Sequence, residues 1–395
     1  MDTIRLKAGR SAPFKGHHPW LFSGAIARIE GNPVPGDWVR IVDDKGVFIA
    51  YGLYNPHSQI RVRLYAFSES ELPTASFWQD RIMNAIRLRE SVLAMPAAPD
   101  SACRLINSEG DGLSGLTVDR FGDYLSVQFT SLALFVHKDT ILNCLESMTK
   151  CRGIILRTEQ DMLEEENLVL KDGAVRGTLP ENPLIISENG VRFEVNLQTG
   201  QKTGFYLDQR ANRILVEQFA PGKSVLDLCT YSGGFALHAA KAGAKLVTAV
   251  DVSASALELA LRNAVLNGFD NIAFHKSDMF KYLEKCLTER IKYDLIVLDP
   301  PKMTRSRGAV QGALKGYLQL NAMALQCLNQ GGVLLTCSCS GRVSRDDFLL
   351  TLHRAALSVQ KQLQILEVRG ADKDHPVSSA CPESEYLKCV VCNIV

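Results

Sequence analysis

The chain has 395 residues, of which 46% are hydrophobic and 22% charged, and its 44 basic side chains almost balance 43 acidic ones. At roughly 150 residues per domain, this length predicts two or three globular domains, and the composition supplies apolar surface for more than one core. The balanced charge neither indicates nor excludes a nucleic-acid partner, because such binding needs a local basic patch rather than a global excess.

Nothing in the sequence indicates a membrane or secreted protein. No window reaches the run of about 18 apolar residues that a membrane helix needs, and the N-terminal residues MDTIRLKAGRSAPF contain no apolar signal core. The eleven cysteines are odd in number and lack a framework spacing, which is typical of reduced thiols in the cytoplasm. The close pairs Cys337/Cys339 and Cys389/Cys392 do not have the spacing of a four-ligand zinc site, so we predict no metal.

Residues 1–72 are predicted to form a small, slightly basic β-barrel. Apolar alternation at 38–42 and 47–50 flanks the turn-rich tetrapeptide Asp43-Asp-Lys-Gly46, which predicts a hairpin. Residues 73–196 are predicted to form a compact α+β middle domain. Its expected elements are helices over 74–93 and 133–149, strands at 116–118 and 124–129 around a turn at 119–122, and strands at 153–156 and 191–195.

Residues 197–395 have the texture of a Rossmann-like α/β domain. Apolar strand cores alternate with helical runs such as 255–267, which predicts a doubly wound, mostly parallel sheet. The expected strands are 224–228, 246–250, 272–275, 293–298 and 332–336.

Four features follow successive strands of this sheet, where ligands of such folds bind. The segment Asp227-Leu-Cys-Thr-Tyr231-Ser232-Gly233-Gly234 follows the first strand, and its glycines let the backbone approach a ligand at a helix start. Asp251 after the second strand can accept hydrogen bonds from both hydroxyls of a ribose, and Asp278 after the third can accept from an adenine amine. Asp299-Pro-Pro-Lys302 follows the fourth strand.

This set of residues favours S-adenosylmethionine (SAM) as the cofactor. A dinucleotide-binding fold would carry G-x-G-x-x-G after the first strand, and the chain has Tyr231-Ser-Gly-Gly there instead. Each acid alone is more often a helix cap than a ligand, but four at successive strand ends are hard to explain by capping. An Asp-Pro-Pro motif also serves methylation of exocyclic nitrogens, which stays open as an alternative chemistry.

Two cysteines after the fifth strand provide a candidate nucleophile. Carbon 5 of a pyrimidine becomes nucleophilic when a thiolate adds to carbon 6, so methylation there needs a cysteine beside the donor. Cys339 is favoured, with Cys337 second and with burial as small apolar residues as the alternative for both. The thiol needs a positive neighbour to ionise, and Lys302 and Arg342 are near in the motifs.

The chain resembles the large-subunit ribosomal RNA methyltransferase I family, which methylates carbon 5 of a cytosine in bacterial 23S rRNA. The segments that carry the resemblance are Gly16-His-His-Pro-Trp-Leu-Phe-Ser23, Thr203-Gly-Phe-Tyr-Leu-Asp-Gln-Arg210, Tyr231-Ser-Gly-Gly234, Asp299-Pro-Pro-Lys302, Ser338-Cys-Ser-Gly341 and Asp374-His-Pro-Val377. They span nearly the whole chain, and their combination is specific.

The resemblance implies an N-terminal PUA domain that binds RNA, a middle domain, and a catalytic domain that binds SAM. It implies that the segment containing Phe205, Asp208, Gln209 and Arg210 packs over the methionine end of the donor, and that Cys339 is the nucleophile. Many other RNA cytosine-5 methyltransferases have Pro-Cys at the site where this chain has Pro-Pro, so only one motif cysteine remains unless Cys337 takes part.

The expected partner is 23S rRNA, contacted by barrel residues such as Arg5, Lys7 and Arg10, unless these are solvated charges on a structural barrel. The target base would leave its stack to reach a pocket between Asp299 and Cys339. Two alternatives remain: methylation of an amino nitrogen through Asp299-Pro-Pro-Lys302, or an inactive RNA-binding protein. A homodimer is compatible with this type of protein, and the sequence identifies neither the general base nor the nucleotide modified.

Overall fold

The computed structural model describes residues 1–74, 76–95, 97–158, 164–198, 200, 203–304 and 307–395. These residues form two compact units, each assembled from separate stretches of chain. Unit 1 contains Met1–Ile186, Val195–Leu207 and Lys373–Ser384, and unit 2 contains Ser187–Glu194, Asp208–Asp372 and Glu385–Val395. The chain therefore passes from unit 1 into unit 2 three times.

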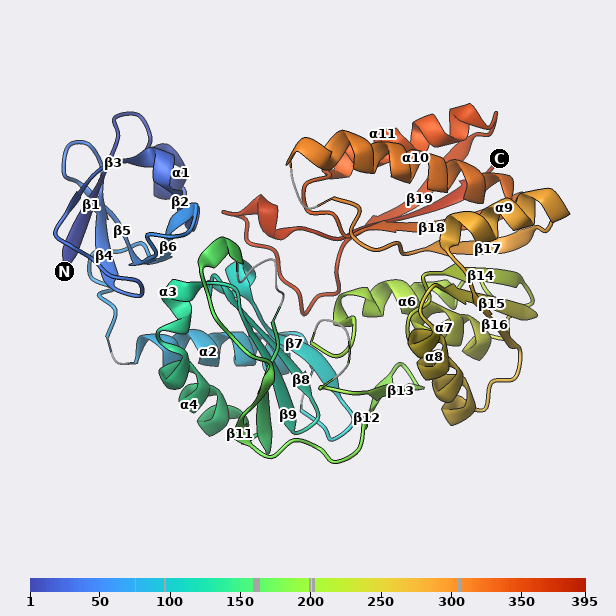
Figure 1. The fold of residues 1–395 in the computed structure, drawn as a ribbon, viewed down its shortest axis with the longest axis horizontal. Coiled ribbons are helices and arrows are strands. Elements are labelled where there is room, and N and C mark those ends of the chain that lie inside the picture. Colours follow the sequence, from blue (N-terminus) through green and yellow to red (C-terminus); the bar gives the residue numbers. More distant parts are fainter. Residues whose placement is uncertain (75, 96, 159–163, 199, 201–202, 305–306) are drawn as a thin grey trace. The chain divides into compact units, whose positions relative to one another are not determined.

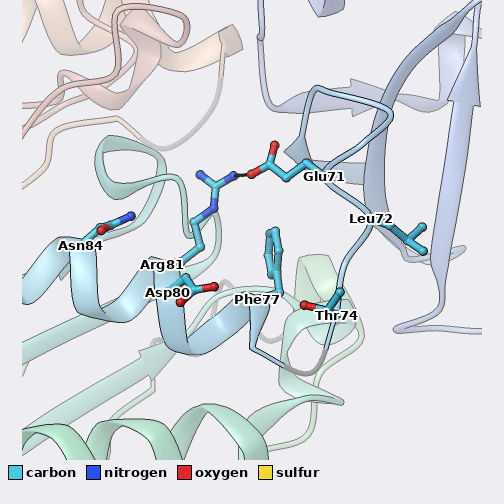
Figure 2. A pocket seen from close by; sticks show the side chains of 7 residues that line it. All are labelled: Glu71, Leu72, Thr74, Phe77, Asp80, Arg81 and Asn84. Atoms are coloured by element: carbon cyan, nitrogen blue, oxygen red, sulfur yellow. Dashed lines mark hydrogen bonds and ion pairs between the residues drawn. The ribbon is translucent and has the colours of Figure 1, made fainter.

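The N-terminal part of unit 1 is a six-stranded sheet in the order β2-β6-β5-β4-β1-β3 (Figure 1). β4 and β5 pair antiparallel around residues 43–46, which confirms the predicted hairpin. Asp43 closes this turn, because its Oδ1 accepts from the backbone N–H groups of Lys45 (3.0 Å) and Val47 (2.9 Å). The elements are β1 Asp2–Leu6, α1 Ala12–Lys15, β2 Trp20–Phe22, β3 Ile26–Glu30, β4 Trp38–Val42, β5 Phe48–Tyr54 and β6 Ile60–Ala66.

The second part of unit 1 is a five-stranded sheet in the order β11-β10-β9-β8-β7. Apolar residues of α2 and α4, including Trp78, Ile82 and Leu145, share one core with residues of these strands. The elements are α2 Phe77–Arg87, β7 Ala102–Asn107, β8 Leu116–Phe121, β9 Tyr124–Phe129, α3 Leu132–Phe135, α4 Lys138–Thr149, β10 Gly153–Leu156 and β11 Gly173–Gly177. A separate two-stranded sheet consists of β12 Leu184–Glu188 and β13 Val191–Val195.

Two predictions for this part of the chain were wrong in detail. Residues 119–121, expected in a turn, continue strand β8, because the Asp119 carboxylate is fully buried and pairs with Arg104 of β7 at 2.5 Å. The helix expected over 133–149 is broken between α3 and α4 at His137, whose Nε2 lies 2.8 Å from the carbonyl oxygen of Gly36. In both places a polar side chain has a long-range partner that the local pattern does not reveal.

Unit 2 is built on a seven-stranded sheet in the order β16-β15-β14-β17-β18-β20-β19, as predicted for a Rossmann-like domain (Figure 1). The first five strands in this order are parallel, whereas β20 pairs antiparallel with both β18 and β19. The strands are β14 Ser224–Leu228, β15 Leu246–Asp251, β16 Ile272–Lys276, β17 Tyr293–Leu298, β18 Leu328–Ser338, β19 Leu363–Arg369 and β20 Lys388–Ile394. The helices are α6 Arg210–Val216, α7 Gly234–Lys241, α8 Ala254–Asn267, α9 Met279–Glu289, α10 Val310–Gln326 and α11 Arg345–Ser358.

Helices pack on both faces of this sheet, and the strands alternate between the two cores. Leu295 and Val297 of β17 lie in the core formed with α6 and α7, whereas Ile296 and Leu298 lie in the core formed with α9, α10 and α11. Burial on both faces explains the continuous apolar runs of these strands. None of the helices in the described ranges is long and apolar enough to cross a membrane.

Replacing Arg89 with methionine is expected to destabilise unit 1 strongly. The Arg89 side chain is fully buried and donates to both carboxylate oxygens of Asp111, at 2.5 and 2.9 Å. Loss of the guanidinium leaves a buried carboxylate without its counter-charge, which costs about 3–5 kcal/mol. Urea unfolding measures this cost. Arg87→Met, at the exposed end of α2, is the control and should change it by less than about 0.5 kcal/mol; equal losses in the two variants would contradict the prediction.

Candidate active site

The strand order of unit 2 has a switch point between β14 and β17. β15 and β16 extend the sheet on one side of β14, whereas β17 and β18 extend it on the other. In open α/β sheets, ligands bind beyond the carboxyl ends of the strands at such a point. The residues that follow β14 and β17 are therefore the candidate site, and they are the predicted segments 227–234 and 299–302.

Asp227 organises the loop after β14. Its carboxyl group is fully buried, and Oδ2 accepts from the hydroxyl of Thr230 (2.6 Å) and the backbone N–H of Ala236 (3.0 Å). Oδ1 is buried without a hydrogen-bond partner among the described residues. Burial raises the pKa of Asp227 to about 7, against these two hydrogen bonds, and the charges of Asp299 and Asp251 raise it further. Asp227 thus holds the loop through buried hydrogen bonds to Thr230 and Ala236.

The loop that follows β14 has an irregular backbone. Cys229, Tyr231 and Gly233 all have positive φ angles, of 63°, 50° and 83°. At Gly234, the first residue of α7, a Cβ atom would lie 2.7 Å from Cδ of Arg213, so this position has no room for a side chain. Ser232 is buried, and its carbonyl oxygen accepts from Nδ2 of Asn263 (3.0 Å). The result is a tight strand-to-helix turn of the kind that receives a ligand at a helix start.

Asp251 and Asp278, the two acids assigned to the nucleoside, both bind backbone N–H groups. Asp251 ends β15, and its Oδ2 accepts from Tyr231 N–H and its Oδ1 from Ser253 N–H, both at 2.9 Å. Asp278 is the N-cap of α9, because its Oδ1 accepts from the N–H groups of the first turn. Helix capping, the alternative interpretation of these acids, therefore accounts for part of the hydrogen bonding of Asp278. Each carboxylate accepts from two backbone N–H groups and keeps lone pairs for further donors, since an ionised carboxylate accepts about four hydrogen bonds.

Asp208 and Arg210, two residues of the predicted methionine-end segment, lie at the start of the long stretch of unit 2, Asp208–Asp372. The Tyr386 hydroxyl donates to Asp208 Oδ2 at 2.5 Å, and Asp372 N–H donates to the Asp208 carbonyl oxygen at 2.9 Å. Arg210 pairs with Asp372 at 3.0 Å and lies 3.7 Å from Glu188. These contacts tie the segment to residues near the C-terminus that the motif alone did not suggest.

Gln209 and Phe205 are the remaining residues of the predicted methionine-end segment. Gln209 is buried, and its Oε1 accepts from Nδ2 of Asn212 at 2.7 Å. Phe205 is buried in unit 1, whereas Gln209 belongs to unit 2. The role of the segment stays a prediction.

Cys339 and the Asp299-Pro-Pro-Lys302 segment lie together at the ends of β18 and β17. Leu298 of β17 is in register with Thr336 of β18, so the two strands finish side by side. The half-buried thiol of Cys339 donates to the carbonyl oxygen of Pro300 at 3.9 Å. Lys302 is exposed.

Cys337 has a different environment from Cys339. It lies inside β18, is fully buried, and is the register partner of Cys389 on β20. Burial raises the pKa of the Cys337 thiol well above its usual value, and the neighbouring Cys389 raises it further. A protonated, inaccessible thiol cannot act as a nucleophile, so the geometry favours Cys339.

Sequence reasoning missed Lys388, a buried cation close to Cys339. It begins β20 opposite Ser338 of β18, and its side chain is 2% exposed. Its Nζ donates to the carbonyl oxygens of Ser340 and Tyr386, each at 2.8 Å. The sequence motif around Cys339 gave no signal for it, because 49 residues separate Lys388 from Cys339 along the chain.

Among the residues that the structure describes, one group of potential metal ligands occurs, formed by His18, Cys381 and Glu383 of unit 1. The backbone N–H of Trp20 donates to His18 Nδ1 at 3.2 Å, which leaves the proton of a neutral ring on Nε2. Nε2 lies 3.4 Å from a carboxylate oxygen of Glu383 and can donate to it. A histidine with its proton on Nε2 is not a metal ligand through that atom, so hydrogen bonding accounts for the group.

Comparison with known families agrees with this geometry. A PUA-like domain model matches residues 4–67, and an S-adenosylmethionine-dependent methyltransferase model matches residues 174–372. The chain is therefore a SAM-dependent methyltransferase with a PUA-like N-terminal domain, and SAM is its methyl donor.

Whole-chain relatives define the family more closely. The chain is 40% identical over 394 residues to the ribosomal RNA large subunit methyltransferase I of Shewanella denitrificans, with 99% of each chain covered. It is 40% identical over 390 residues to the protein of the same name from Aeromonas salmonicida, with 98% of each covered. The chain belongs to the ribosomal RNA large subunit methyltransferase I family.

Solved structures show the same fold over the full length. A putative SAM-dependent methyltransferase from Streptococcus mutans is 21% identical, with a TM-score of 0.85 and 100% of both chains covered. A putative methyltransferase complexed with SAH matches with a TM-score of 0.86 at 21% identity, again over 100% of both chains. At this identity the likeness concerns the fold, and it confirms the predicted α/β architecture.

Gly234→Ala is expected to weaken SAM binding at least about tenfold and to destabilise the protein by about 1–3 kcal/mol. The new methyl group would meet Arg213, which cannot move away because Glu188 holds its guanidinium with bonds of 2.6 and 2.7 Å. Isothermal titration calorimetry and urea unfolding measure the two effects. Gly312→Ala in α10, where a Cβ meets nothing within 4 Å, is the control and should leave binding unchanged. Unaltered binding in Gly234→Ala would disprove the steric argument.

Asp227→Asn is expected to change how stability depends on pH. The folded protein holds a proton on Asp227 up to about pH 7, whereas the unfolded chain loses it near the ordinary aspartate pKa of 3.8. Stability from this group is therefore complete below that lower value and is lost as pH rises toward 7. The amide does not titrate, so the variant does not lose this stability. Between pH 4 and 8, its free energy of unfolding should therefore rise relative to that of wild type by up to about 4 kcal/mol. Urea unfolding across this range tests it, and a difference that stays constant with pH would refute it.

Proposed function

We propose that this enzyme methylates carbon 5 of a cytosine in 23S rRNA through a covalent adduct between Cys339 and carbon 6 of the base. The observation that carries the proposal is the position of Cys339: a half-buried thiol 3.9 Å from the Pro300 carbonyl oxygen, where β17 and β18 end beside the cofactor loop of β14. The relatives named above are ribosomal RNA large subunit methyltransferases, which supports rRNA as the substrate.

The proposed chemistry follows from the weak nucleophilicity of carbon 5 in a cytosine. The Cys339 thiolate adds to carbon 6, and the electron pair of the 5,6 double bond becomes available at carbon 5. Carbon 5 forms a bond to the methyl group of SAM as the sulfur–methyl bond breaks, and S-adenosylhomocysteine is the leaving group. A base then removes the proton from carbon 5, and the double bond reforms as the thiolate leaves. One cysteine is sufficient for addition and departure.

The remaining site residues are proposed to hold the donor. Asp251 would accept from the ribose hydroxyls and Asp278 from the adenine amine, through the lone pairs that their backbone contacts leave free. Tyr231, Ser232 and Gly233 would present the loop backbone to the donor. Residues 205–210 would cover its methionine end, with Asp208 and Arg210 held by their contacts to Tyr386 and Asp372. Asp299 and Lys302 would border the target base.

We further propose that residues 1–72 bind rRNA, residues 73–196 form the middle domain and residues 197–395 carry catalysis. Of the three predicted RNA contacts, Arg5 donates to the carbonyl oxygen of Asp44 (3.3 Å), and Lys7 donates to that of Gly24 (2.9 Å). A carbonyl oxygen does not neutralise the charge of Lys7, whereas Arg5 also forms an ion pair with Glu30 at 3.4 Å. Arg10 is exposed and is the strongest of the three for a phosphate contact.

Trapping with 5-fluorocytosine-containing rRNA and SAM tests the proposal. Fluorine at carbon 5 blocks the final elimination, so wild type and Cys337→Ala should form a stable protein–RNA adduct, and Cys339→Ala should form none. Denaturing gels detect the adduct, and mass spectrometry of the linked peptide identifies the cysteine.

Two other outcomes would contradict the proposal, the first in its carbon 5 chemistry and the second in its nucleophile. Methyl transfer to unmodified rRNA by Cys339→Ala, with no adduct in wild type, would move the reaction to an amino nitrogen beside Asp299-Pro-Pro-Lys302. An adduct lost in Cys337→Ala rather than in Cys339→Ala would assign the nucleophile to the buried thiol.

A further inference from the structure

Lys388 is a lysine whose position in the protein interior has no ion pair to explain it. Its side chain is 2% exposed, and none of the described carboxylates lies within 4.0 Å of its Nζ. The groups that accept hydrogen bonds from Nζ are two neutral carbonyl oxygens, those of Ser340 and Tyr386. Lysine is almost never buried without a charged partner, so this one requires an explanation.

The hydrogen bonds of Lys388 direct its charge to the turn that carries Cys339. Ser340, whose carbonyl oxygen accepts from Nζ at 2.8 Å, is the residue after Cys339. An ammonium group has three N–H bonds, and the two carbonyl oxygens account for two of them. β20 holds the lysine in this place, because Lys388 is in register with Ser338, the residue before Cys339.

The charges near Cys339 come from several elements. Asp299 follows β17 and Tyr317 lies on α10; the negative charges of Cys339 and Asp299 both raise the pKa of Tyr317, after burial. Tyr317 in turn makes a 3.1 Å hydrogen bond to the hydroxyl of Ser340. Asp299 opposes ionisation of the thiol, so a cation is needed on another side. Arg345 and Glu385, whose charges also act on Lys388, form an ion pair, so their opposite charges largely cancel.

Burial lowers the pKa of Lys388 to about 8, and a negative charge on Cys339 raises it against that trend. Coupling between two titrating groups is reciprocal: a thiolate that stabilises the ammonium is stabilised by it to the same extent. At pH 7 the lysine is still largely protonated. Lys302 and Arg342, the cations that the motifs suggested, are exposed, and water and salt screen their charges.

We propose that Lys388 is the positioning residue that stabilises the thiolate of Cys339 and thereby makes Cys339 the reactive cysteine of this protein. Its consequence for catalysis rests on the function proposed above, whereas the ionisation of Cys339 does not. The thiol proton passes to solvent, Lys388 keeps its own proton, and the thiolate remains as the group that adds to carbon 6.

The test is the rate of iodoacetamide alkylation of Cys339 as a function of pH, followed by mass spectrometry of its peptide. Wild type should show half-maximal reactivity below pH 8. In Lys388→Met, reactivity at pH 7 should fall at least about tenfold, which is one unit of thiol pKa, while the rate at pH 10 should match wild type. Lys388→Arg should restore most of the reactivity at pH 7. A variant that only loosened the turn would change the rate at every pH.

A matched control is Lys361→Met. Lys361 is also partly buried and donates to a backbone carbonyl oxygen, that of Leu325 at 2.8 Å, and burial lowers its pKa as well. This variant should leave the Cys339 profile unchanged. SAM binding by calorimetry establishes that each variant is folded.

Three results would overturn the inference. The first, which needs no variant, is a wild-type alkylation profile centred at or above pH 9. The second is a Lys388→Met profile identical to that of wild type. The third is a shift of the profile in Lys361→Met equal to that in Lys388→Met. The outcome is separable from the proposed function: a shifted profile without a 5-fluorocytosine adduct upholds the role of Lys388 and rejects carbon 5 chemistry. An adduct with an unshifted profile does the reverse.

Discussion

Burial of β14 and β17 on both faces is the constraint on which the candidate site depends. Successive residues of β17, such as Leu295 and Ile296, point into different cores, so the interior of the strand has no place for a reactive polar group. Polar chemistry is confined to the ends, where the backbone leaves the sheet. Asp227, the penultimate residue of β14, shows what happens to a polar group that lies within the strand: its carboxyl group is fully buried, and burial raises its pKa to about 7. The groups that can meet a ligand follow the last buried residue of each strand.

The same constraint separates two cysteines that are only two residues apart. Cys337 is still within β18 and pairs with β20, whereas Cys339 lies past the strand in the turn. Burial raises the pKa of the first thiol, and the second is half-buried beside the Pro300 carbonyl oxygen. If β18 continued for two more residues in its pairing with β20, Cys339 would lie inside the sheet as Cys337 does. The end of β18 therefore determines which of the two thiols is buried and which is partly exposed.

Electrostatics divides the site into two regions. Around the β14 loop the charges are negative: burial raises the pKa of the Cys229 thiol, and Asp251 and Asp299 raise it further. Such an environment suits SAM, whose sulfonium and ammonium groups are positive, but it opposes a thiolate. Lys388 supplies positive charge next to the turn of Cys339, on the β20 side. The antiparallel strand β20, appended to the parallel sheet, therefore brings a buried cation to an otherwise negative edge of the sheet, which is the feature on which the role proposed for Lys388 rests.

The sequence by itself determined the features that depend on local order. Apolar runs located β14 and β17 to the residue, the segment 227–234 and the acids Asp251 and Asp278 marked the strand ends, and the motifs identified the family. Tertiary structure decided the features that depend on distant partners. Asp119 lies within a strand and pairs with Arg104, Cys337 is buried where β18 pairs with β20, and Lys388, 49 positions after Cys339 in the sequence, donates to the turn that carries Cys339. Periodicity reports which face of an element is buried, but it carries no information about which charged or polar group from another element lies against that face.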